Sequence, residues 1–213
     1  MQSRDATTLS GHPIRFDKPC ECPILVEDIR PGLFNICRYN GGVDLRLVQH
    51  LVIGIQLMDL WRAEGTGPAY SVVLRAIHSD QDPDELDVLK GYFGIHDDAE
   101  VYISDLPAGL KKYLPGYRKI EREWELWVHS QRGLPYEECP DRSFLKWIDI
   151  RCCVVETVVW GHPAQQVVQD RMGLPILDQE RQIGETVKAL SLETCWAIVS
   201  EVVDRAVKLK QKE

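Results

Sequence analysis

The apolar residues of this chain recur with helical spacing along most of its length. In "VDLRLVQHLVIGIQLMDLWRAEG" they stand at 47, 48, 51, 52, 55, 58 and 61, which is the stripe of one helix face. A long helix is predicted from about Pro115 to Gln131, because Gly133 and Pro135 follow it directly. No segment alternates strongly between apolar and polar residues as a half-buried strand would. The pattern therefore predicts an all-α fold.

Capping and breaking residues give the bounds of the other predicted helices. Asp82 as N-cap and Pro83 at the first helical position predict a single helix through "DPDELDVLKGYFGIHDDAEVYI". A further helix begins at an Asp cap in "CPDRSFLKWIDIRCCVVETVVWG" and runs to Gly161, and the last one fills "LSLETCWAIVSEVVDRAVKLKQKE". Shorter helices are predicted over "PAYSVVLRAIHS" and from about Pro31 to Tyr39.

The length and composition narrow the classes of protein. With 213 residues and 44% hydrophobic residues, the chain can bury a core in one domain. We expect an irregular N-terminal segment (1–24), a core (25–165) and a C-terminal helical extension packed on it (166–213). A net charge of −8 makes duplex nucleic acid a poor partner. No apolar run approaches the roughly 20 residues of a membrane helix, and no signal peptide is evident. Seven cysteines without paired CxxC motifs predict reduced thiols and a cytoplasmic protein.

The segment "YFGIHDDAEVYISDLP" combines apolar helical spacing with many ionisable residues. On one continuous helix, His96 and Glu100 share a face, and His96 and Asp97 point about 100° apart. A solvated acidic face is one interpretation. The other is a half-buried face, which the interleaved Ile95, Ala99 and Tyr102 favour. Charged groups buried there would need partners or a metal ion. We expect Asp98 to point toward solvent.

Further metal ligands are available elsewhere in the chain. His50 lies in a largely apolar helix, where a single histidine is more often a core residue with a satisfied ring. Asp149 stands between Ile148 and Ile150 on another helix, and a buried Asp there would need a partner. Two imidazoles and two carboxylates suit Mn, Fe, Co, Ni or Zn. The four candidate ligands are His50, His96, Asp97 and Asp149.

An isolated His, a His-Asp pair and a distant Asp on an all-α chain resemble the HD-domain phosphohydrolase family. Three motifs extend this resemblance in the family's order. They are "ICRYNGG" followed by "VQH", then "HDDAEVYISDLPAGLKKYLPGYRKIE", then "LKWIDIRCCVVET". They are similar to segments of the bacterial 5′-deoxynucleotidases and of phage relatives, some of which are dATP triphosphohydrolases. The resemblance covers roughly residues 24–161 and implies a helical bundle with a metal site in its core.

The resemblance implies a role for each matching residue. The implied metal ligands are His50, His96, Asp97 and Asp149. The implied acid/base pair around the attacking water is Glu100 and Asp105. Asp141 in "CPDRS" also precedes an Arg, but the Lys three residues before Asp149 and the Glu seven residues after it favour Asp149.

The implied substrate contacts are mostly cations. Arg38 would contact phosphate or sugar, and Lys111 and Lys146 would bind phosphate. Tyr39 follows Arg38 beside the implied pocket and is our candidate for a contact to the base. Mg is a further candidate ion on the phosphates of the substrate.

The resemblance implies a metal-dependent phosphohydrolase of deoxynucleotides. We expect a dNTP triphosphohydrolase that prefers dATP and gives deoxynucleoside and triphosphate. A 5′-deoxynucleotidase acting on dNMPs is the alternative within the family. A non-catalytic helical module that binds nucleotide or metal is the alternative outside it. Relatives are commonly homo-oligomers, and a phage-encoded member would act in the host cytoplasm.

Overall fold

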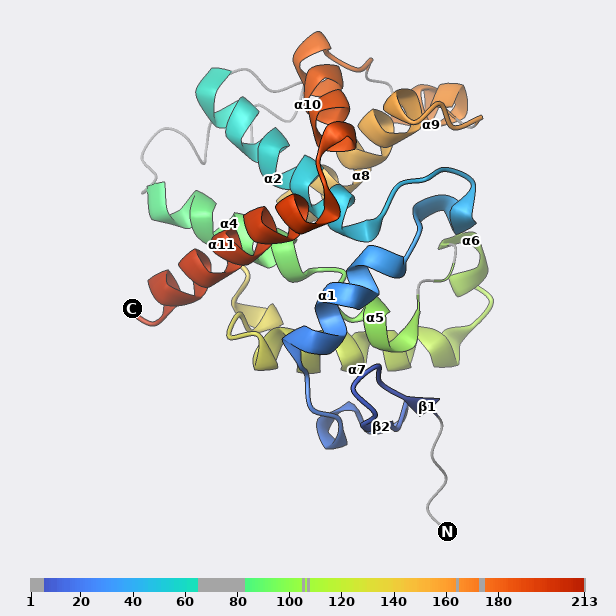
Figure 1. Ribbon diagram of the computed structural model, residues 1–213, viewed down its shortest axis with the longest axis vertical. Helices are drawn as coiled ribbons and strands as arrows, with labels where there is room; N and C mark the ends of the chain where they lie inside the picture. The colour runs from blue at the N-terminus through green and yellow to red at the C-terminus, as the bar shows by residue number, and fades with distance from the viewer. Residues whose placement is uncertain are drawn as a thin grey trace. The chain divides into compact units, whose positions relative to one another are not determined.

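The computed structural model describes residues 6–64, 83–104, 106, 108–163, 165–172 and 175–212. Helices make up most of this part of the chain (Figure 1). Two short strands, β1 (Ala6–Thr7) and β2 (Pro13–Ile14), pair antiparallel near the N-terminus. The predicted all-α class is confirmed. Of the helices in the described ranges, none combines the length and apolar character of a bilayer-spanning segment.

The chain divides into two compact units. The first unit holds the residues up to Ile36 and from Ile95 to Cys139, and the second holds Cys37–Gly94 and Pro140–Glu213. Each unit is therefore built from two separate stretches of the chain. The chain passes from one unit to the other three times, and one of these crossings falls at the end of helix α4 (Pro83–Ile95), directly before His96.

The first unit has a core of aromatic side chains. Trp124 is fully buried, its ring stacks on Tyr102 at 5.3 Å between centroids, and its Nε1 donates to the Phe16 carbonyl at 3.2 Å. Buried Asp28 accepts from the backbone and hydroxyl of Ser10, which ties the strand hairpin to a helix. The helical elements of this unit are η1 (Pro19–Glu21), α1 (Val26–Asn35), α5 (Glu100–Ile103), α6 (Ala108–Lys111), α7 (Pro115–Gln131) and η3 (Tyr136–Glu138).

The bounds of α7 are those predicted, whereas α1 differs. α1 begins at Val26, so Pro31 lies inside it rather than at its start, and it ends at Asn35. Both Ile29 and Leu33 are fully buried, so the apolar face extends to both sides of the proline. Burial of that face outweighs the backbone hydrogen bond that Pro31 cannot donate.

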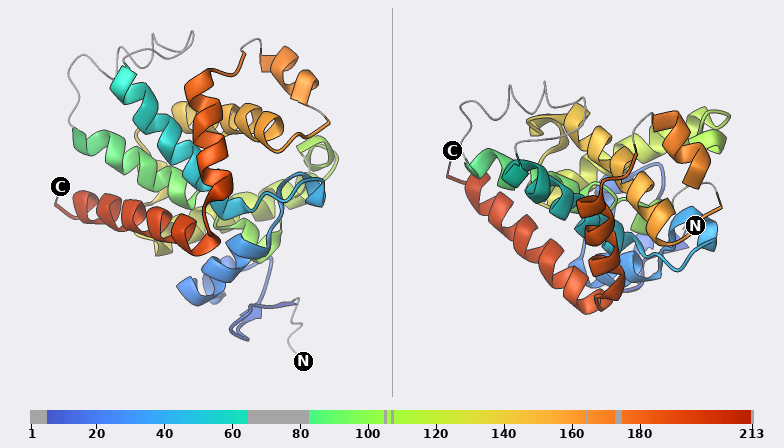
Figure 2. Two further views of the ribbon diagram at one scale, coloured as in Figure 1. Left: turned by 45° about the horizontal axis from the view of Figure 1, so that its top comes forward. Right: turned by 90° about the horizontal axis from the view of Figure 1, so that it is seen from above.

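The second unit is built around α2 (Leu47–Glu64). The helices that pack against α2 include α8 (Arg142–Val159), α10 (Asp178–Ala189) and α11 (Leu192–Lys210) (Figure 2). Among the described residues, the second unit also contains the short elements η2 (Arg38–Gly41) and α9 (Gln165–Met172), together with α4. Gly54 of α2 faces the Phe93 ring of α4, where a Cβ would lie 2.0 Å from Cε1. The glycine therefore allows α2 and α4 to approach closely.

Several predicted helices of this unit are confirmed. α2 follows the predicted stripe, α4 begins at Pro83, and α11 matches the last predicted helix. Asp141 caps α8 by accepting from the Phe144 N–H at 2.9 Å, as predicted. Asp82 and the helix predicted over residues 68–79 lie outside the described residues.

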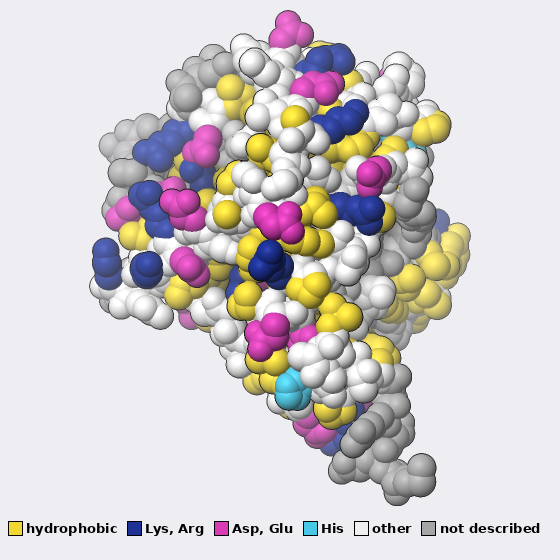
Figure 3. Space-filling view, in the orientation of Figure 1, with side chains coloured by type: hydrophobic (Ala, Val, Ile, Leu, Met, Phe, Trp, Pro, Cys, Tyr) yellow, Lys and Arg dark blue, Asp and Glu magenta, His cyan; other side chains and the backbone are white. Residues whose placement is uncertain are grey.

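The described surface mixes both charges. On the face shown in Figure 3, Lys and Arg side chains alternate with Asp and Glu side chains. This face therefore offers no basic stripe of the kind that tracks a nucleic-acid backbone. All seven cysteines are free thiols, as predicted. Burial raises the pKa of Cys22 and Cys195 to about 11, so both stay protonated at neutral pH.

Candidate metal site

His50 is a buried histidine on the apolar helix α2. Its side chain is fully inaccessible, so its ring nitrogens need partners inside the protein. Nδ1 lies 2.5 Å from Oε1 of Glu156, and the ring packs 5.6 Å from the Phe93 ring. An ionised carboxylate can only accept, so Nδ1 carries the proton and Nε2 keeps its lone pair. That lone pair is what a metal ion requires of histidine.

Glu156 holds His50 in this orientation from α8. Its carboxylate is fully buried and accepts from the Tyr39 hydroxyl at 2.9 Å, while Arg38 Nη2 lies 3.6 Å away. Burial alone would raise the pKa of Glu156. The Arg38 charge and the neighbouring His50 ring, with the hydrogen bonds from His50 and Tyr39, outweigh burial and leave the pKa of Glu156 below its ordinary value. Glu156 therefore stays ionised, and sequence reasoning had not assigned it this role.

Asp149 faces His50 from one face of α8. It lies seven residues before Glu156, which is two helical turns, so both carboxylates share a face. Its Oδ1 is 3.6 Å from His50 Nε2 and 3.9 Å from Arg38 Nη2. Its Oδ2 accepts from Lys146 Nζ at 2.7 Å. This carboxylate is thus surrounded by positive or metal-ligating groups.

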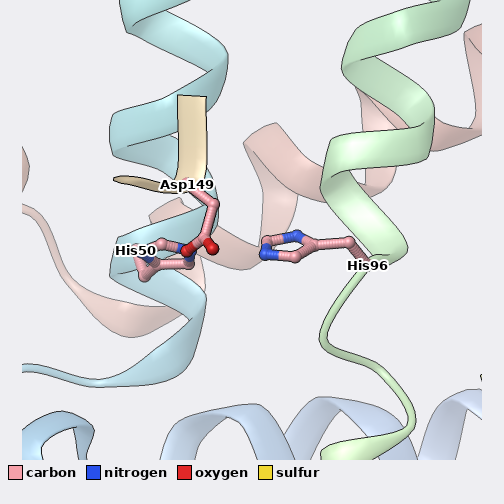
Figure 4. Close-up of side chains that lie close together, drawn as sticks. All are labelled: His50, His96 and Asp149. Atoms are coloured by element: carbon pink, nitrogen blue, oxygen red, sulfur yellow. The ribbon is translucent and has the colours of Figure 1, made fainter. Parts of the chain in front are cut away.

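Three of the predicted ligands come together. His50, His96 and Asp149 each offer one ligand atom, and these atoms all lie within 4.8 Å of one another. Figure 4 shows the His96 ring directed toward the other two side chains. Ligands at 2.0–2.2 Å from one ion are at most about 4.4 Å apart. The N/O composition of this group suits a transition metal.

Asp97 and Asp98 differ in their surroundings. Asp97 Oδ1 lies 3.1 Å from His96 Nε2, and Asp97 as a ligand stays a prediction. Asp98 is fully buried and its Oδ2 lies 3.0 Å from Arg132 Nε, so the prediction that it faces solvent is wrong. Burial raises the pKa of Asp98 to about 7, although the Arg132 charge acts in the opposite direction. Asp98 is a structural residue of the first unit.

The single helix predicted through this segment is also wrong. α4 ends at Ile95, a turn covers 96–99, and α5 begins at Glu100. Two backbone hydrogen bonds in this turn span three residues instead of the four of an α-helix. Asp98 N donates to the Ile95 carbonyl, and Glu100 N donates to the Asp97 carbonyl. His96 and Glu100 therefore do not lie on one continuous helix.

The candidate substrate contacts of the second unit lie beside Asp149 and Glu156 of α8. Arg38 Nη2 is near Asp149, Glu156 and the Cys153 sulfur. Tyr39 has a left-handed backbone, with φ of +55°, and its ring lies 4.7 Å from the His162 ring. The Lys146 side chain is 70% exposed, so it can reach a ligand from solvent.

The remaining candidates belong to the first unit. Lys111 Nζ is paired with Glu121 Oε1 at 2.5 Å, and both side chains are largely buried. Glu100 opens α5 with its side chain partly exposed. Asp105 lies outside the described residues. Asp141, the rejected alternative to Asp149, is used as the cap of α8.

No family model matches the chain. Among curated proteins, it is similar to the uncharacterized protein YfdR of Escherichia coli (strain K12), with 29% identity over 130 residues. The match covers 60% of the chain and 58% of YfdR, so the chain spans less than two thirds of the length of this relative. A likeness of this extent leaves the resemblance to HD-domain phosphohydrolases as a prediction.

Proposed function

We propose that this chain is a metal-dependent phosphohydrolase of deoxynucleotides. Within that class we propose a dNTP triphosphohydrolase that prefers dATP and releases deoxynucleoside and triphosphate. The preference for dATP rests on the resemblance of the three motifs to phage proteins. We further propose that the enzyme works as a homo-oligomer, as its family relatives commonly do.

One observation carries the proposal. A fully buried histidine has its Nδ1 bound to a buried carboxylate, and its Nε2 faces a second carboxylate. In a neutral core histidine with only a packing role, the second ring nitrogen would face a hydrogen-bond donor rather than a carboxylate. The carboxylate–histidine arrangement is the usual support of a metal-ligating imidazole. The ligand atom of His96 near the other two supports the same conclusion.

The chemistry follows from the residue types around this site. A divalent metal, when bound, supplies Lewis-acid chemistry that polarises a phosphoryl oxygen and makes water a better nucleophile. Water attacks the α-phosphorus, and the bond between phosphorus and the 5′ oxygen breaks. The resemblance assigns the proton transfers to Glu100 and Asp105. Arg38 and Lys146 would offset the negative charge that develops on the phosphate.

The two cations beside Asp149 could exchange this carboxylate for a phosphate group of the substrate. Lys146 and Arg38 lie beside this carboxylate at 2.7 and 3.9 Å. A phosphate would offer both cations a second anionic partner. Because the Lys146 side chain is mostly exposed, its ion pair with Asp149 contributes little and can be given up readily.

The product distinguishes the reactions. The protein is incubated with Mn²⁺ or Co²⁺ and with dATP, the other dNTPs, ATP and dAMP, and the products are separated by ion exchange. Triphosphate and deoxyadenosine from dATP are expected. Free phosphate from dAMP with dATP untouched would instead establish a 5′-deoxynucleotidase. Absence of turnover with bound metal would indicate a binding module.

Two aspartates of the α8 region make a matched pair of variants. Asp149→Asn removes a predicted ligand, so we expect loss of metal and of hydrolysis. Asp141→Asn changes the residue that caps α8, and Asn is an equally good cap, so activity should be retained. Full activity in Asp149→Asn would refute the ligand assignment.

A further inference from the structure

Tyr39 has an unusual backbone conformation for its residue type. Its φ of +55° lies in the left-handed region, which is unfavourable for a residue with a Cβ. Such strain persists only where the surroundings hold the residue in place, and it is common at functional sites. The contacts of the Tyr39 side chain indicate what holds it in this conformation.

The side chain of Tyr39 is held at two points. Its hydroxyl donates to Glu156 Oε2 at 2.9 Å, and its ring lies 4.7 Å from the His162 ring with 34° between the planes. A hydrogen bond to a charged group is stronger than one between neutral groups, and it therefore helps to hold Tyr39 in its strained backbone conformation.

The hydrogen bond from Tyr39 completes the surroundings of the Glu156 carboxylate. Oε1 receives His50 Nδ1 and Oε2 receives the Tyr39 hydroxyl, so each oxygen has its own donor. Without the hydroxyl, the partner left to Oε2 among the described residues would be Arg38, whose Nη2 is 3.6 Å away and thus beyond hydrogen-bond distance. The plane of the carboxylate, and with it the orientation of the His50 ring, would then be less restricted.

We propose that Tyr39 is a positioning residue of the metal site, acting through Glu156 on the direction of His50 Nε2. This inference rests on the proposed function insofar as both need a metal at His50. It assigns Tyr39 a role different from the contact to the base predicted from sequence. The two roles are separable, because Phe keeps the ring that would stack on a base and loses only the hydroxyl.

Cobalt binding to the purified protein tests the role directly. Co²⁺ affinity is measured by calorimetry and the ligand field of bound Co²⁺ by its visible absorption. Tyr39→Phe should weaken Co²⁺ binding by about 10- to 100-fold, the usual effect of removing an outer-shell partner, and should alter the visible spectrum. His162→Ala removes the ring contact and leaves the hydroxyl, so it should bind Co²⁺ within a few fold of wild type.

A double-mutant comparison covers the case in which Tyr39→Phe folds poorly. Glu156→Gln should weaken Co²⁺ binding, and adding Tyr39→Phe to it should cause no further loss, because the hydroxyl acts only through Glu156. Additive losses, or a Tyr39→Phe variant with wild-type affinity and spectrum, would overturn the positioning role and leave the proposed function intact. A wild-type protein that binds no Co²⁺ would refute both.

Discussion

Breaking the buried ion pair between Arg151 of α8 and Glu180 of α10 by removing one partner should strongly destabilise the second unit. The side chains are 2% and 0% exposed. Arg151 Nε donates to Glu180 Oε1 at 2.8 Å, and Nη2 donates to Oε2 and, at 2.7 Å, to the Pro175 carbonyl. Glu180 Oε2 also accepts from Leu177 N at 2.9 Å at the start of α10. Removing Glu180 takes the carboxylate partner away from a desolvated guanidinium.

The expected loss follows from that burial. Breaking a buried pair by removing one partner costs about 3–5 kcal/mol. For a chain of this length, about 2–4 °C of Tm is lost per kcal/mol. Glu180→Ala should therefore lower Tm by roughly 6–20 °C. Arg151 lies two residues, or about 200° of helix, from Asp149, so Co²⁺ binding to the folded variant should be unchanged.

Three further variants complete the test, with Tm and urea unfolding as the measurements. Glu185→Ala changes an exposed residue of the same helix and should stay within about 0.5 kcal/mol of wild type. The double variant Arg151→Met with Glu180→Leu should recover most of the stability, because no charge is then buried. Arg151→Met alone should resemble Glu180→Ala. The reasoning is refuted if Glu180→Ala costs less than about 1 kcal/mol or if the double variant loses the sum of the single losses.

Two other predictions concern stability. Gly54→Ala should lower Tm, because the new Cβ would lie 2.0 Å from the Phe93 ring and overpacking costs about 1–3 kcal/mol. The control is Gly116→Ala in α7, whose new Cβ meets nothing within 4 Å and which should be neutral or stabilising. Burial lowers the pKa of His129 to about 4, so the unfolded chain binds more protons between pH 4 and 6.5 and stability falls as pH drops through that range. The shift corresponds to about 3 kcal/mol, and urea unfolding of wild type and His129→Gln from pH 8 to 4 should show this pH dependence only in wild type. Equal pH dependence in both proteins would contradict it.

Local signals were sufficient for the bounds of several helices. α7 begins at Pro115 and ends at Gln131 because a proline at the first position and a glycine after the end are signals that adjacent residues carry. The Asp141 cap of α8 is another such signal. The bounds of α1 were predicted less well, because burial on both sides of Pro31 depends on packing that no local signal records.

The break between α4 and α5 could not be read from the apolar spacing. That spacing continues through the turn at 96–99, so the pattern alone predicts a single helix. The burial of Asp98 depends on Arg132, which stands 34 positions later in the chain. Contacts of this kind are set by tertiary packing, which overrides local propensity.

The candidate site was predicted in part. The residue types and the resemblance identified His50, His96 and Asp149, whose ligand atoms lie together. The role of Glu156 was missed, although its seven-residue spacing from Asp149 already placed both on one helix face. What the spacing could not show is that Glu156 binds the ring of His50, a residue more than one hundred positions earlier.

The two faces of α8 limit how its sequence can change. One face carries Asp149 and Glu156, and the opposite face carries Arg151, which is tied to α10. One inserted residue between 149 and 156 would turn the later part of the helix by about 100° and shift it by about 1.5 Å. Asp149 and Glu156 could then no longer both reach His50. We therefore expect homologues to vary in side-chain identity along this segment while admitting no insertion or deletion within it.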